Sequence, residues 1–181
     1  MTTLVSTSRV ENKSFLNQVL LVIGATLLIV LSGRISIPLP FTPVPIALQS
    51  HVCLLMGVLL GRKMAVTSVI LFLVMGAAGL PVFSLGAAGL ANLLGPRGGY
   101  LIGYLLGTWA VATLIERRRL RSPREKTLAM GLGTLLIYAC GLPQLALFVG
   151  AERVIMLGMV PFLAGDLIKL FISYRLLKRL S

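Results

Sequence analysis

Three charged residues stand within or beside long apolar segments of the sequence, where a charge is costly and therefore suggests a function. Asp166 and Lys169 lie three residues apart, so they share one face of a helix. Arg97 stands in the glycine-rich run 95–100, where glycines allow the backbone to approach a ligand closely. Its guanidinium group is suited to bind a carboxylate. All three residues are therefore candidates for a binding site.

The same residues could instead have purely structural roles. Asp166 and Lys169 could pair with each other and only order the helices, and Arg97 could mark the membrane boundary. Uncharged polar residues could bind a polar head group, or could serve only in packing between helices and in loop capping. These residues are Thr42, Gln49, Ser84, Asn92, Tyr100 and Tyr104.

Motifs for catalysis do not occur in the sequence. It contains no Walker A loop, so the chain cannot use ATP by itself, and it has no zinc-protease or serine-nucleophile motif. Two isolated cysteines do not make a metal site. We therefore expect no catalytic residue, no metal and no cofactor.

The composition is that of a membrane protein. Apolar residues make up 57% of the 181 residues and charged residues only 12%, whereas soluble domains carry about 25% charged residues. No charge occurs over 64–96, 98–115 or 127–151, and a helix needs about 20 residues to cross the hydrocarbon layer. The sequence predicts an all-α integral membrane protein, with 1–181 as a single transmembrane domain.

Proline, glycine and charge divide the chain into six predicted transmembrane helices: 15–33, 46–60, 64–78, 98–115, 127–149 and 154–177. Four prolines make 35–45 a rigid loop. The glycine-punctuated segment 82–96 is better suited to line a pocket than to span, since irregular backbone at membrane depth must be buried or face a cavity. Gly141 to Pro143 could kink the fifth helix, and Pro161 suits a first helical turn.

The positive-inside rule sets the predicted orientation. With the N-terminus inside, thirteen of the seventeen Lys and Arg residues fall on the cytoplasmic side, in 1–14, at 62–63, in a basic loop over 116–126 and near the C-terminus. Both termini are then cytoplasmic. The proline loop 35–45, the segment 82–96 and the connection 150–160 lie on the outer face and cap an outward-facing pocket. The net charge of +12 thus indicates contact with acidic membrane lipids rather than with nucleic acid.

The first helix carries small residues about two turns apart. Gly24, Ala25, Ser32 and Gly33 would let another helix approach closely. They could dock another subunit or pack within the chain.

Four ordered blocks of the sequence are Ile37-Pro-Leu-Pro-Phe-Thr-Pro-Val-Pro-Ile46, Gly76-Ala-Ala-Gly-Leu-Pro-Val-Phe83, Gly95-Pro-Arg-Gly-Gly-Tyr-Leu-Ile-Gly-Tyr104 and Pro161-Phe-Leu-Ala-Gly-Asp-Leu-Ile-Lys169. Together they resemble the BioY family, the biotin-specific S components of energy-coupling factor (ECF) transporters. The resemblance implies six transmembrane helices in the cytoplasmic membrane and high-affinity binding of biotin from the outside for uptake. It also implies docking on a transmembrane coupling protein with two ATPase subunits, and a transport subunit rather than an enzyme.

The resemblance also suggests roles for the charged residues. Asp166 would accept hydrogen bonds from the ureido N–H groups of biotin, and Arg97 or Lys169 would neutralise its carboxylate. Three alternatives are open: an S component for another vitamin, a solitary biotin carrier without ATPase subunits, and an intramembrane enzyme that uses Asp166 and Lys169.

Overall fold

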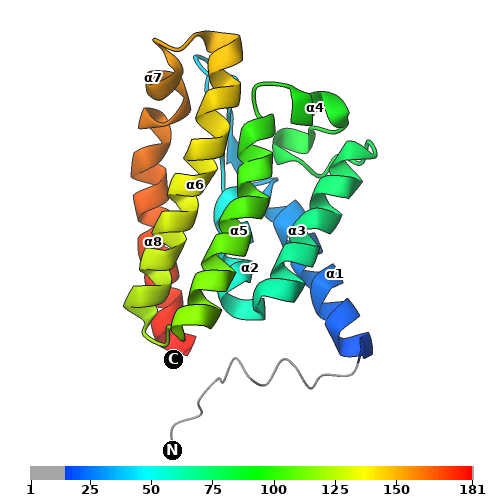
Figure 1. Ribbon diagram of the computed structural model, residues 1–181. Coiled ribbons are helices and arrows are strands. Elements are labelled where there is room, and N and C mark those ends of the chain that lie inside the picture. The colour runs from blue at the N-terminus through cyan, green and yellow to red at the C-terminus, as the bar shows by residue number, and fades with distance from the viewer. Residues whose placement is uncertain (1–14, 181) are drawn as a thin grey trace, which may run out of the picture.

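The computed structural model describes residues 15–180, which fold into a mostly helical bundle (Figure 1). Six longer helices are α1 (Phe15–Ser32), α2 (Gln49–Leu60), α3 (Arg62–Ala77), α5 (Gly98–Arg118), α6 (Pro123–Val149) and α8 (Val160–Leu180). Shorter elements are β1 (Ser36–Ile37), β2 (Ile46–Ala47), the 3-10 turn η2 (Ser84–Gly86), α4 (Leu90–Leu94) and α7 (Val154–Gly158). The predicted cytoplasmic segment 1–14 lies outside the described residues.

Four segments of the described chain are long and apolar enough to cross a membrane: Phe15–Ser32, Gly98–Arg118, Pro123–Val149 and Val154–Leu180. The helices α2 and α3 are shorter, with 12 and 16 residues. At 1.5 Å per residue they extend over about 18 and 24 Å. Six transmembrane helices therefore stay a prediction. The predicted helix 154–177 is divided at Met159 into α7 and α8.

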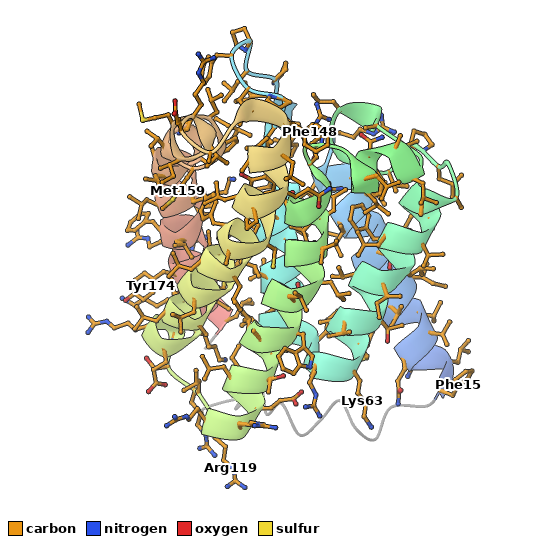
Figure 2. The ribbon with its side chains drawn as sticks, turned by 45° about the horizontal axis from the view of Figure 1, so that its top comes forward. Phe15, Lys63, Arg119, Phe148, Met159 and Tyr174 are labelled. Atoms are coloured by element: carbon orange, nitrogen blue, oxygen red, sulfur yellow. The ribbon has the colours of Figure 1, made fainter. Side chains whose placement is uncertain are left out.

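The connections between the helices gather at two opposite ends of the bundle (Figure 1). One end carries the β1–β2 hairpin with its proline loop, the segment 78–97 with α4, and the connection from α6 to α7. The other end carries the α2–α3 turn, the α5–α6 connection and the C-terminal end of α8, and Lys63 and Arg119 lie there in Figure 2. The three loops that the sequence places on one face do lie at one end.

A seam of glycines brings α5 and α6 into close contact. A Cβ atom added to Gly103 of α5 would lie 2.8 Å from Cα of Ile137 on α6, and one added to Gly107 would lie 2.9 Å from the carbonyl oxygen of Gly133. Real Cβ atoms do not approach backbone so closely, so only glycine permits this packing. The ring of Tyr100 on α5 packs on Gly141 of α6 in the same way, since a Cβ atom added there would lie 2.4 Å from the ring.

The predicted basic loop over 116–126 is wrong, because only residues 119–122 separate α5 from α6. Helix α5 continues to Arg118, and α6 begins at Pro123. Ser122 and Glu125 form a capping box at the start of α6, and this pair satisfies backbone N–H groups of the first turn. The basic residues therefore stand on helix ends rather than on an extended loop.

The start of the second predicted helix also differs from the prediction. Ile46 and Ala47 pair with Ile37 and Ser36 as strand β2, so α2 begins only at Gln49. Pro143 lies inside α6 without dividing it. Pro161 is the second residue of α8, a first-turn position as predicted.

Candidate functional site

A cavity of about 420 Å³ lies between α2, α5, α6 and α8, close to the β2 strand. It brings together an acid, a cation, several hydroxyl groups and apolar or aromatic walls. The lining residues are Val44, Pro45, Ala47, Ser50, Tyr100, Tyr104, Thr134, Ile137, Tyr138, Phe162, Asp166 and Lys169. A mostly apolar cavity with a few convergent polar groups is typical of a small-molecule site.

Asp166 and Lys169 form a charged pair at this cavity. The Nζ atom of Lys169 lies 3.1 Å from Oδ1 of Asp166, and both side chains are largely buried, with 13% and 15% of their surface exposed. Lys169 also donates a hydrogen bond of 2.9 Å to the carbonyl oxygen of Ala47, and Tyr138 donates its hydroxyl hydrogen to Oδ2 of Asp166. Each carboxylate oxygen accepts about two hydrogen bonds, so Asp166 has acceptor capacity left for a ligand.

A second cavity of about 340 Å³ contains Arg97. It shares Val44, Pro45, Tyr100 and Tyr104 with the first cavity, so the two are neighbouring parts of one region. Its other lining residues are Phe83, Ser84, Asn92 and Leu101.

Arg97 also holds the proline loop. Its Nε atom donates a hydrogen bond of 2.7 Å to the carbonyl oxygen of Pro43. The side chain is half-buried at the start of α5, and within the described chain the terminal nitrogens of its guanidinium group form no hydrogen bond. These nitrogens are therefore available for an anionic ligand.

Two glutamines hold the irregular segment 78–97 against the bundle. Gln49 of α2 donates to the carbonyl oxygens of Ile29 and Val82 at 3.1 and 3.0 Å. Gln144 of α6 donates to those of Leu93 and Gly95 at 3.0 and 2.8 Å. The segment carries Ser84, Asn92 and Arg97 to the second cavity, so these hydrogen bonds position that wall.

The structure brings seven of the nine candidate binding residues to the two cavities: Ser84, Asn92, Arg97, Tyr100, Tyr104, Asp166 and Lys169. Thr42 and Gln49 line neither cavity. The hydroxyl oxygen of Thr42 accepts a hydrogen bond from the backbone of Val44 within the proline loop, and Gln49 is fully buried. Ser84 is bonded to Gln49, with its hydroxyl 3.1 Å from the amide oxygen.

Three polar residues line the first cavity without having been predicted from the sequence: Ser50, Thr134 and Tyr138. A signal was present for Thr134 and Tyr138, because they are polar residues four positions apart in the apolar middle of a helix and therefore share a face. Ser50 gave no such signal, since it stands beside the buried Gln49 at the start of α2.

The four small residues predicted for the first helix, of which Gly33 follows directly after α1, do not share one environment. Ala25, Ser32 and Gly33 are buried within the chain, and a Cβ atom on Gly33 would lie 2.6 Å from the amide nitrogen of Gln49. Gly24 is exposed, with open space beside it. Internal packing thus accounts for three of the four residues. Docking of another subunit stays a prediction, and of the four residues only Gly24 is exposed to contact one.

Known proteins resemble this chain over nearly its whole length. The family model described as the BioY family matches residues 2–181. "Biotin transporter BioY" of Thermotoga maritima is 38% identical over 157 residues, which cover 86% of this chain and 90% of that protein. The protein of the same name from Rhodobacter capsulatus is 34% identical, over 87% of this chain and 88% of its own.

A solved structure has the same arrangement of helices. It is the crystal structure of the S-component for biotin from an ECF-type ABC transporter, with a TM-score of 0.83 and 27% sequence identity over 91% of this chain and 90% of that one. The mostly helical fold with its long apolar helices is therefore the S-component fold. On the match over residues 2–181 and these relatives, the chain belongs to the BioY family.

Proposed function

We propose that this chain is the substrate-binding subunit of a biotin transporter, a multi-pass protein of the cell membrane rather than an enzyme. One observation carries the proposal most directly: Asp166, Lys169 and Arg97 converge on two joined cavities with apolar and aromatic walls. Two cations and one acid leave a net positive charge for a monoanionic ligand. The names of its relatives, biotin transporter and S-component for biotin, support the same substrate.

The two ends of biotin suit the two cavities. Its ureido ring offers N–H donors, which Asp166 accepts beside Tyr138 in the first cavity. Lys169 is already paired with Asp166, whereas the terminal nitrogens of Arg97 are available, so Arg97 takes the carboxylate in the second cavity. Tyr100 and Tyr104, which line both cavities, enclose the apolar part of the ligand.

The orientation follows from the distribution of charge. We propose that all six longer helices cross the membrane, that both termini are cytoplasmic, and that the chain acts as one transmembrane domain. The end of the bundle with the α2–α3 turn and the α5–α6 connection carries most of the Lys and Arg residues, and such residues collect on the cytoplasmic side. The loops around the site then face the outside.

Transport requires a source of energy that this sequence does not contain. The solved relative is a component of an ECF-type ABC transporter, and we propose that this chain likewise works with a transmembrane coupling protein and two ATPase subunits. Gly24 on the exposed face of α1 is the candidate point of contact. No cofactor of its own is required for binding.

Uptake by cells tests the function as a whole. We would express the chain in a biotin-requiring host without its own biotin transporter and measure uptake of radiolabelled biotin, with and without coupling and ATPase subunits. Uptake that needs those subunits supports the proposal, and uptake by the chain alone would make it a solitary carrier. Failure in both settings, with the chain present in the membrane, would contradict it.

A further inference from the structure

Helix α8 carries both charged residues of the first cavity but has little apolar contact with the bundle. Phe162, Ser173 and Leu177 are its buried residues. Large apolar side chains on its outer face are widely exposed, among them Leu167 at 68% and Phe171 at 61%. The rotation of α8 about its own axis therefore depends on its polar contacts as well as on a short apolar face made by Phe162, Leu170 and Leu177.

A buried polar contact joins α8 to α2 one turn beyond the charged pair. Nε2 of His51 on α2 lies 2.6 Å from the hydroxyl oxygen of Ser173 on α8, and 6% of His51 and 3% of Ser173 are exposed. Asp166, Lys169 and Ser173 are spaced by three and then four residues, so they share one face of α8.

The same stretch of chain contacts α8 twice. Ala47 accepts a hydrogen bond from Lys169, and His51, four residues later, bonds Ser173, four residues beyond Lys169. Two contacts in matching register determine how the shared face is turned. His51 does not line either cavity.

We infer that His51 is a positioning residue for ligand binding: its bond to Ser173 sets the rotation of α8 and so turns Asp166 and Lys169 toward the cavity. The inference rests on the proposed function for its ligand, because it concerns the same site. His51 holds α8 so that the carboxylate of Asp166 meets Tyr138 and the ligand together.

Variants of both partners test the bond. His51→Leu and Ser173→Ala should each weaken biotin binding about tenfold, because a buried polar partner is left unpaired. His51→Gln places an amide nitrogen near the position of Nε2 and should bind like the parent. The double variant His51→Leu/Ser173→Ala should bind biotin as tightly as His51→Leu alone. In a protein that already carries Asp166→Asn, adding His51→Leu should lower the affinity for biotin little further. A purely structural role would weaken both backgrounds equally.

A distance measurement keeps the inference testable apart from biotin. Nitroxide labels at Leu132→Cys on α6 and Leu167→Cys on α8, both exposed positions, would be introduced in a Cys140→Ser background, with the buried Cys53 left in place. His51→Leu and Ser173→Ala should shift the label distance, and His51→Gln should not. If the parent binds biotin, the inference would be overturned by label distances in His51→Leu and Ser173→Ala that equal those of the parent. A biotin affinity of these two variants equal to that of the parent would overturn it as well. A parent without biotin binding would contradict the proposed function, and the label distances would then decide the role of His51.

Discussion

The hydroxyl group of Tyr138 on α6 donates a hydrogen bond to the carboxylate of Asp166 on α8. The two residues are 28 positions apart in the sequence, and their contact joins the tightly packed α5–α6 pair to the sparsely packed α8. Lys169 completes the cluster from the other side of the carboxylate and extends it to Ala47. The acid of the site is thus bonded directly to α6 and, through Lys169, linked to β2.

Replacing Tyr138 by Phe should weaken biotin binding by about tenfold or more, because a hydrogen bond to a charged group contributes about 1.5–3 kcal/mol. The ring would stay in its edge-to-face contact with Tyr100, so the fold should persist. Equilibrium binding of radiolabelled biotin measures the loss. Tyr174→Phe removes a hydroxyl from the same helix as Asp166 but away from both cavities, and it should bind as the parent does.

Replacing Asp166 by Asn should have a larger effect. The change removes the charge that pairs with Lys169 and turns one acceptor into a donor facing the ligand, and loss of one partner from a buried charged hydrogen bond costs about 2–5 kcal/mol. Affinity for biotin should fall by about 30-fold or more. Glu116→Gln, at the opposite end of the bundle, is the control, and equal affinities in the two variants would argue against this site.

Arg97 should be sensitive to the charge of the ligand. Arg97→Gln is expected to weaken the binding of biotin strongly but that of biotin methyl ester little, because the ester has no carboxylate for the guanidinium group to neutralise. Competition against radiolabelled biotin in both proteins gives the four affinities. A change of equal size for both ligands would mean that Arg97 acts only through its hydrogen bond to Pro43.

The hydrogen bonds of Gln144 should hold segment 78–97 in place against the bundle. Gln144→Leu removes donors to Leu93 and Gly95 and should speed hydrogen–deuterium exchange in that segment while exchange in α3 stays unchanged. Thr67→Val is a suitable control, since the Thr67 hydroxyl bonds only within its own helix, to the carbonyl oxygen of Lys63. Parent-like exchange in Gln144→Leu would show that the segment is held by other contacts.

The glycine seam predicts opposite outcomes for two similar substitutions. Gly103→Ala should lower the free energy of unfolding by about 1–3 kcal/mol, because the added methyl group would clash with the backbone of Ile137. Gly131→Ala adds the same group on α6 where no atom lies within 4 Å, so stability should be unchanged or rise by up to about 1 kcal/mol. Thermal unfolding in detergent compares the pair directly.

Much of the fold was predictable because lipid imposes strong rules on sequence. Uncharged runs located the helices within a few residues, and prolines and glycines located the loops that surround the site. The predictions failed where local contacts determine the residue at which a helix begins. The capping box at Ser122 moved the start of α6 into the supposed basic loop, and pairing of Ile46 with Ile37 delayed the start of α2.

The charged residues of the candidate site were also predictable, since Asp166, Lys169 and Arg97 are conspicuous against an apolar background. The assignment of neutral residues was less successful. Gln49 and Tyr138 look equally suited to bind a ligand in the sequence, yet Gln49 is used to hold a loop and Tyr138 reaches the cavity. Which of two polar residues faces a cavity depends on helix rotation and packing, and for an apolar chain periodicity indicates these only weakly.

Titration of the purified, detergent-solubilised chain with radiolabelled biotin tests the central claim most directly. Unlabelled biotin, desthiobiotin, thiamine and riboflavin would serve as competitors, and thermal unfolding would establish that the protein is folded. The account predicts saturable binding of one biotin per chain, displaced by biotin and desthiobiotin but not by the other two vitamins. Displacement by thiamine or riboflavin, or no biotin binding by folded protein, would contradict it.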